Sequence, residues 1–219
     1  MARSGSRSAP GPRASKASAD TRSTLISAAI ETLKADGFVG ASARAIAGRA
    51  GCNQGLVFYH FGSVANLLLA ALDAVSSDRL ERYGAAAAQA ESPSELANLA
   101  EVIFQEDLDA GHATVLVELI SGASSMPGFG AEVATRIESW TRFAQSAIDR
   151  SIDPKVLAAT APPSELAYGV VAMYLGLEML SHLNGDRTQA LSLFRRASRL
   201  ITWADALGVL SPAPTKEST

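Results

Sequence analysis

Residues 42–61 read SARAIAGRAGCNQGLVFYHF, and this stretch decides the fold of the first part of the chain. Ser42 is a good amino-terminal cap for a short helix, and Gly51 stands where a helix commonly ends in a left-handed conformation. Asn53 can cap a second short helix that runs to Phe61. Two short helices that meet at a glycine-containing turn predict a helix-turn-helix with its second helix presented outward. The apolar residues that can form its small core are Ile46, Ala47, Ala50, Cys52, Val57 and Phe61.

The outward face of the second helix carries residues suited to DNA. Val57 and Phe61 lie four residues apart and face inward, so the residues around them face outward. An amide side chain can pair with an adenine edge in the major groove, and an imidazole or phenol can reach a phosphate. Gly55 lets the helix approach the duplex backbone closely. The predicted DNA-contacting residues of this segment are Asn53, Gln54, Gly55, Leu56, Tyr59 and His60.

A longer pattern surrounds this motif. It comprises Ala28-Ala29 and Gly37-Phe38, then Ser42, Ile46-Ala47 and Ala50-Gly51, and finally Phe58-Tyr59-His60-Phe61 followed by Gly62-Ser63. In these positions, residues about 21–68 resemble the DNA-binding domain of the tetracycline-repressor (TetR/AcrR) family of bacterial transcriptional regulators. The resemblance implies a homodimer whose carboxy-terminal domain binds a small molecule and thereby changes DNA affinity.

The resemblance also implies a role for each matching position. It places Ser42 and Arg44 on phosphates, Gln54 and Leu56 near bases, and Tyr59 and His60 on phosphates or base edges. Two departures lie nearby: Phe58 stands where the family usually has tyrosine, and Val64 where it often has lysine. Each departure removes a polar contact or a charge, so the basic amino-terminal arm is expected to compensate in the minor groove.

Charge is distributed unevenly along the 219 residues. Residues 1–66 hold eight Lys and Arg against three Asp and Glu, a net charge of +5, and the remainder carries −8 of the total of −3. A basic first part predicts an anionic partner for that part only, here double-stranded DNA. The single cysteine, Cys52, allows no internal disulfide, which fits a reducing cytosol.

Helical periodicity continues through almost all of the chain, so the predicted fold is all-α. The first helix is expected to open at Asp20 or Thr21 and to end at Gly37, and 121–130 is expected to be a loop. The predicted organisation is a disordered basic arm (1–19), a helix-turn-helix domain (20–66), a helical ligand-binding and dimerisation domain (67–210) and a disordered tail (211–219).

The last two predicted helices, about 164–183 and 187–207, are unusually apolar. The first is apolar nearly all round, and the second has a wide apolar stripe, so both need covering. A partner subunit that packs these helices into a four-helix interface is favoured over a monomer in which both are central helices. No apolar run approaches the ~20 residues that span a bilayer, so neither a membrane nor a secretory leader is expected, and a cytoplasmic, nucleoid-associated protein is.

Catalytic and metal-binding motifs do not stand out in the sequence. It holds no HExxH, paired CxxC, phosphate loop or Gly-x-Ser-x-Gly elbow, so we expect no enzyme, no metal and no cofactor. Glu178 and His182 lie one helical turn apart, which predicts an ordinary hydrogen-bonded pair and, less favoured, a metal or ligand pair. Aromatic and flexible apolar residues predict a largely apolar effector pocket, oriented by Glu118, His112 or Glu178. The expected ligand-binding set is Phe104, Glu118, Met126, Trp140, Phe143 and Tyr174.

These observations predict a ligand-responsive DNA-binding regulator that binds a near-palindromic operator as a homodimer. A repressor is favoured over an activator because a bound dimer can block polymerase. The alternative is an all-helical ligand-binding or interaction module whose helix-turn-helix binds DNA weakly or no longer binds it. Phe58 and Val64 favour this alternative. The identities of the effector and the operator are not encoded in any pattern of the sequence.

Overall fold

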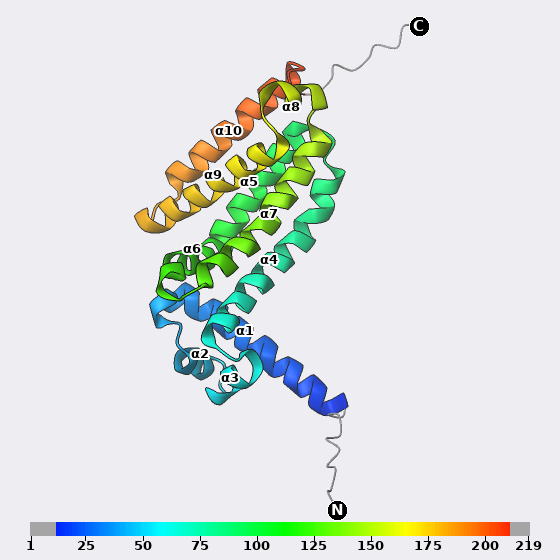
Figure 1. Ribbon diagram of the computed structural model, residues 1–219. Coiled ribbons are helices and arrows are strands. Elements are labelled where there is room, and N and C mark those ends of the chain that lie inside the picture. Colours follow the sequence, from blue (N-terminus) through cyan, green and yellow to red (C-terminus); the bar gives the residue numbers. More distant parts are fainter. Residues whose placement is uncertain (1–11, 211–219) are drawn as a thin grey trace, which may run out of the picture. The chain divides into compact units, whose positions relative to one another are not determined.

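The computed structural model describes residues 12–210, with side chains from residue 18 onward, and this part is helical throughout with no strand (Figure 1). The all-α prediction is therefore confirmed. The chain divides into two compact units, Met1–Ala71 and Leu72–Thr219. The elements are α1 (Pro12–Gly40), α2 (Ala43–Arg49), α3 (Gly55–Phe61), α4 (Val64–Gln89), α5 (Pro93–Ala110), α6 (His112–Gly122), the 3-10 turn η1 (Ala123–Ser125), α7 (Phe129–Ser151), α8 (Pro154–Thr160), α9 (Pro163–Asn184) and α10 (Thr188–Ala206).

The first unit differs from the prediction at its start. Helix α1 begins at Pro12 rather than at Asp20 or Thr21, so the expected arm of residues 1–19 is helical from residue 12 onward. Its earlier part, and the expected tail of residues 211–219, lie outside the described residues. Gly37 interrupts α1 with a φ of 68° and a ψ of −176°, which is where the sequence predicts the first helix to end.

The division between the units falls inside α4, whereas the sequence predicts it at residues 66 and 67. The apolar pattern of α4 runs without a break through Leu67, Leu68, Leu72 and Val75, all of which are buried. One continuous helix therefore serves both units, and no turn signal marks the boundary between them.

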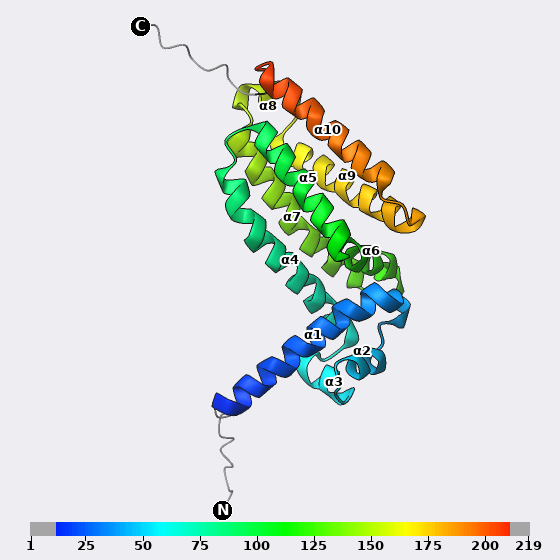
Figure 2. The ribbon, with the colours of Figure 1, turned by 180° about the vertical axis from the view of Figure 1, so that it is seen from behind.

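In the second unit, α5, α7, α9 and α10 run side by side (Figures 1 and 2). Helix α9 packs on α7 and α6, and α10 packs on α5. The predicted loop at 121–130 is shorter than expected, because η1 occupies Ala123–Ser125 and α7 already begins at Phe129. Gly128, with a φ of 75°, supplies the left-handed residue from which α7 starts.

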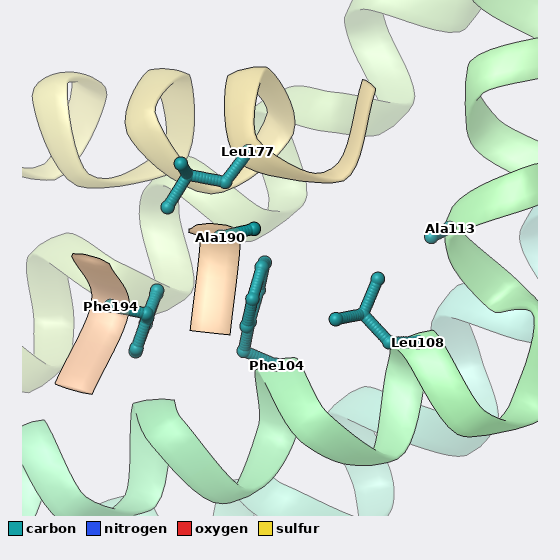
Figure 3. Packing of buried hydrophobic residues seen from close by; sticks show 6 residues of the cluster. All are labelled: Phe104, Leu108, Ala113, Leu177, Ala190 and Phe194. Atoms are coloured by element: carbon teal, nitrogen blue, oxygen red, sulfur yellow. The ribbon is translucent and has the colours of Figure 1, made fainter. Parts of the chain in front are cut away.

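The core of this unit centres on Phe104, which is fully buried (Figure 3). Its ring stacks on Phe194 of α10, with centroids 4.7 Å apart and planes 6° from parallel. Tyr174 of α9 meets the same ring edge-on at 5.2 Å. Three helices thus meet at one aromatic contact, and the other members of the cluster are Leu108, Ala113, Leu177 and Ala190.

Helix α4 joins its neighbours in the second unit through long polar side chains. Arg79 donates a hydrogen bond to the buried carboxylate of Asp107 on α5. The Tyr83 hydroxyl donates to Glu106, also on α5. Asp73 accepts from Nε of Arg136 on α7 at 2.8 Å. Charged groups, rather than interdigitated apolar side chains alone, therefore hold this helix in register.

Helix α9 is long and apolar enough to cross a membrane by length and composition alone, which differs from the sequence-based expectation. Only 22% of its most apolar window is buried within the chain. Its polar residues include Glu178, which is fully buried, and His182, which pairs with Glu118 of α6. The core helix of a soluble protein passes the same test of length and composition.

We expect Phe104→Ala to lower the free energy of unfolding by about 3–5 kcal/mol, because the lost ring leaves a cavity beneath Phe194 and Tyr174. Urea denaturation followed by circular dichroism measures this loss. Val102→Ala is the matched control on the same helix, since Val102 is 49% exposed, and it is expected to change stability by less than about 1 kcal/mol. Equal effects of the two substitutions would contradict the placement of Phe104 in the core.

Candidate nucleic-acid interface

The helix-turn-helix is built as the sequence predicts, from two capped short helices. The Ser42 Oγ accepts a hydrogen bond from the Ala45 backbone N–H at 3.2 Å and so caps α2. Asn53 Oδ1 accepts from the Gly55 N–H at 2.7 Å and caps α3. Between them, Gly51 adopts a φ of 67°, a conformation that suits glycine. These local bonds fix the angle at which α3 leaves the turn.

Glycine at position 55 fits the cap as well as the predicted approach to DNA. A Cβ built at Gly55 would lie 3.1 Å from Asn53 Oδ1, so a larger residue would press on the capping oxygen. Gly62, with a φ of 76°, ends α3, and Ser63 Oγ then accepts from the Asn66 N–H at 3.1 Å to begin α4. The segment therefore places α3 between two tightly defined turns.

The inner side of α3 matches the prediction, since Val57 is fully buried and Phe61 is 8% exposed. Its outer side is aromatic, with Tyr59 79% exposed and Phe58 51% exposed. The His60 ring lies edge-on to Tyr59 at 4.9 Å. From the sequence, Phe58 was considered only because it lacks the hydroxyl of the usual tyrosine. Its position directly after the buried Val57 also indicates that it lies on the exposed face.

The remaining predicted contact residues also lie at or near the surface. Ser42, Arg44, Asn53, Gln54 and Gly55 are exposed, while Leu56 and His60 are half-buried. The eight predicted residues come from the start of α2, the turn and α3, so the structure brings them together along one short stretch of the first unit.

Two other cations of this unit have structural partners. Arg49 donates to the Glu31 carbonyl at 2.8 Å and to Asp36 Oδ2 at 2.9 Å, which ties the end of α2 to α1. The Arg22 guanidinium lies 4.9 Å from the centre of the Phe61 ring, in a cation–π contact. Arg49 and Arg22 therefore make contacts that stabilise the first unit itself.

Residues 25–71 match the family model of bacterial regulatory proteins of the tetR family. These residues carry the amino-terminal domain of the tetR family. The match covers α2, α3, most of α1 and the start of α4, which are the elements that carry the predicted pattern. No curated protein matches the sequence.

Solved structures share the fold over most of the chain. A proposed TetR-family regulator from Rhodococcus sp. has a TM-score of 0.68 at 20% identity, covering 84% of this chain and 98% of its own. A TetR transcriptional regulator from Chloroflexus aurantiacus has a TM-score of 0.67 at 18% identity, with 85% and 96% coverage. One from Pectobacterium atrosepticum has a TM-score of 0.65 at 18% identity, with 90% and 98% coverage. At these identities the likeness shows the fold of the family's regulators.

Two cavities in the described part of the second unit are defined by their lining residues. The smaller, of about 10 Å³, has room for little more than one water molecule and is lined by Arg79, His112 and Trp140, among others. The larger, of about 210 Å³, is lined by Leu108, Ala113, Thr114, Glu178, Ser181, His182, Gly185 and Arg187. Both cavities lie within the unit to which the sequence assigns the effector.

The six predicted ligand residues do not gather in one place. Trp140 lines the smaller cavity, and Phe143 meets its ring edge-on at 5.8 Å. Phe104 and Tyr174 belong to the aromatic contact of the core, and Met126 follows η1. Among the residues that line the larger cavity in the described chain, none is from this set. Glu118 is connected to the larger cavity indirectly, because it pairs at 3.3 Å with His182, and His182 lines that cavity.

The contact between His182 and Glu118 also changes a prediction from the sequence. Glu178 and His182 lie one turn apart on α9, but His182 Nε2 contacts Glu118 of α6 instead of Glu178. Glu178 turns into the interior and is 1% exposed. The predicted pairing within one helix gives way to a pair between helices, because tertiary packing sets the direction of each side chain.

A buried polar cluster lies beside the smaller cavity, which Arg79 and His112 line. Asp107 accepts hydrogen bonds from Arg79 and from the Tyr174 hydroxyl, and His112 Nδ1 lies 3.4 Å from its other oxygen. The Arg79 guanidinium lies 4.3 Å from the Trp140 ring centre. Sequence reasoning missed Arg79, although it falls on the helical stripe of Leu72, Val75 and Tyr83, a position where a charged residue needs a buried partner.

Burial raises the pKa of Glu178 to about 7, although the nearby Arg79 and Tyr174 side chains act in the opposite direction. The pKa of Tyr174 is raised too, first by burial and then by Glu178. A carboxyl group with such a pKa gains or loses its proton near neutral pH, so the charge of the buried Glu178 side chain depends on pH.

The raised pKa makes stability depend on pH. The folded protein holds the Glu178 proton more tightly than the unfolded chain, so folding takes up a proton between about pH 4.5 and 7. The contribution of this group to the free energy of unfolding therefore falls as pH rises through that window. The free energy of unfolding of Glu178→Gln minus that of the wild type should therefore rise by about 2–3 kcal/mol from pH 5 to pH 8.

Urea denaturation of both proteins at several pH values measures that difference. Glu138→Gln is the control, because Glu138 is an exposed residue of α7, and its difference from wild type should stay constant. A difference for Glu178→Gln that is also independent of pH would contradict the raised pKa.

Proposed function

We propose that the protein is a DNA-binding repressor that binds a near-palindromic operator as a homodimer and is released by a small molecule. The observation that carries this proposal is the exposed aromatic face of α3, where Tyr59 is 79% and Phe58 51% exposed. Large rings on a helix this short gain nothing from solvent, whereas a DNA groove offers them phosphates, sugars and thymine methyl groups.

The amino-terminal end of α3 provides the base-reading groups of the proposal. Gln54 is exposed there and has no capping role in the structure, so its amide is available for an adenine edge. Asn53 uses its oxygen to cap α3 and keeps its amino group as a donor. Arg44, exposed on α2, supplies a phosphate contact, in keeping with the net positive charge of residues 1–66.

Homodimerisation through α9 and α10 is supported by the apolar side chains that these helices leave exposed. In α9, Tyr168 is 70% and Leu183 71% exposed; in α10, Leu200 is 66% and Trp203 71% exposed. Large apolar side chains exposed on two neighbouring helices favour a protein interface, and a two-fold pair would cover both copies with the same residues. Two reading heads related by a two-fold axis then require an operator with two symmetric half-sites.

The effector is proposed to act through the second unit, where the larger cavity lies. A ligand need only favour a state in which the two heads are wrongly spaced for the operator. By linkage, DNA and ligand then weaken each other's binding by the same coupling free energy, typically about 1–3 kcal/mol.

In a second candidate function, the second unit binds a ligand or a partner but the helix-turn-helix does not recognise DNA. Val64 stands at the start of α4, where a lysine would face a phosphate, and Phe58 lacks a hydroxyl for the same purpose. In this reading the chain is a helical ligand-binding or interaction module, and DNA affinity is low at every sequence.

We expect Arg44→Ala and Gln54→Ala to weaken DNA binding in different ways. Arg44→Ala removes a phosphate contact, so affinity falls on every duplex and the salt slope decreases by about 1. Gln54→Ala removes a base contact, so preference at one base pair relaxes by about 1–3 kcal/mol. Fluorescence anisotropy on a duplex enriched by the wild-type protein and on its single-base variants, across a salt series, separates the two effects.

The control for this series is Arg142→Ala, which removes an exposed arginine from α7 in the second unit. It should leave both affinity and salt slope unchanged. If Arg44→Ala and Gln54→Ala behave like this control, the residue assignments are wrong and the second candidate function gains support.

We expect Leu200→Glu to convert the dimer to a monomer. In the proposed two-fold interface, the substitution would bury a carboxylate from each copy without a positive partner. Sedimentation velocity measures the change, and circular dichroism checks that the helices remain. Val102→Glu, at an exposed apolar position of α5, is the control and should stay dimeric. A wild-type protein that sediments as a monomer would contradict the interface.

A further inference from the structure

Two buried polar atoms of the second unit have no hydrogen-bond partner in the described part of the chain, and they are complementary. One is a donor, the Nε–H of Arg79 on α4, and the other is an acceptor, Oε1 of Glu178 on α9. Both side chains are more than nine-tenths buried, so bulk water does not supply the missing partners. Leaving both groups unbonded costs free energy, which bonding them to each other would recover.

Two carboxyl groups share one arginine in this part of the interior. Asp107 accepts hydrogen bonds from Arg79 and from the Tyr174 hydroxyl, and His112 Nδ1 lies 3.4 Å from its other oxygen, so its negative charge is compensated. Glu178 has no such donor at Oε1. A second buried carboxylate without a donor would be poorly stabilised, so the described arrangement suits a Glu178 side chain that holds its proton.

The other titratable groups around the cluster are bonded to partners other than Glu178. They come from α4, α6, α7, α9 and the turn before α10: Tyr83 bonds to Glu106, Arg136 to Asp73, His182 to Glu118 and Arg187 to Asp109. Arg79 is therefore the cation whose unbonded N–H can serve Glu178, and its positive charge already acts to lower the pKa of that carboxyl group.

We propose that Arg79 and Glu178 form a proton-linked switch inside the second unit. While Glu178 holds its proton, Arg79 bonds to Asp107 as described; when Glu178 releases the proton to solvent, the Arg79 Nε–H turns to the Glu178 carboxylate. One buried cation is then shared between α5 and α9 instead of serving α5 alone. A half-satisfied polar network of this kind has two arrangements close in free energy, and one proton decides between them.

Trp140 of α7 is a built-in reporter of the position of Arg79. The Arg79 guanidinium lies 4.3 Å from the centre of the Trp140 ring, in a cation–π contact. A guanidinium that changes partners changes this contact, and with it the fluorescence of the indole. The chain has two tryptophans, and the other, Trp203, is 71% exposed, so Trp203→Phe leaves Trp140 as the single emitter.

The test follows Trp140 emission of the full chain carrying Trp203→Phe between pH 5.5 and pH 8.5. A single transition centred near pH 7 is expected, with about four-fifths of the change between pH 6 and pH 8. Adding Glu178→Gln should abolish the transition. Glu138→Gln, an exposed carboxyl group two residues from Trp140, and His112→Gln, which removes the imidazole nearest the cluster, should both retain it.

Infrared difference spectroscopy on the same Trp203→Phe protein follows the carbonyl band of the neutral carboxyl group, so the account stays testable without the Glu178 variant. The band is expected to disappear with the same midpoint as the fluorescence transition. Loss of the band without a change in Trp140 emission would show that Arg79 keeps its partner and would overturn the switch. A fluorescence transition that persists in Glu178→Gln, or vanishes in His112→Gln, would also overturn it.

Discussion

A buried ion pair between Arg79 of α4 and Asp107 of α5 is the interaction on which the second unit depends. Both side chains are more than nine-tenths buried, and removing one partner from such a pair commonly costs about 3–5 kcal/mol because the other charge is left alone. Tyr174 and His112 complete the cluster, so helices α4, α5, α6 and α9 meet at one carboxylate. Helix α4, which carries Arg79, begins in the first unit.

The first unit depends on constraints of a different kind. Its two short helices contribute little apolar area, and their geometry is fixed by the Ser42 and Asn53 caps and by the left-handed glycines at 51 and 62. These are local features, encoded within a few residues. That is why the sequence alone predicted the helix-turn-helix, the buried Val57 and Phe61, and the outward direction of Tyr59.

Features that depend on contacts between distant residues were harder to predict. The pairing of His182 with Glu118, the Arg79 cluster and the orphaned oxygen of Glu178 arise from helices far apart in the chain, and periodicity says only that each residue faces inward or outward. The start of α1 was missed for a related reason: residues 12–19 are rich in serine, alanine and basic residues, without an apolar stripe to mark a helix. The aromatic residues assigned to a pocket were ambiguous, because core packing and ligand contact use the same side chains.

The central claim is that two copies of this chain read DNA together. Selection of bound duplexes from a random pool by the purified full chain at near-physiological salt tests it most directly. The account predicts an enriched near-palindrome whose half-sites are one helical turn, about 10 base pairs, or a multiple of it apart. Absence of any enriched sequence, even at low salt, would contradict the account and leave the second unit as the site of the protein's activity.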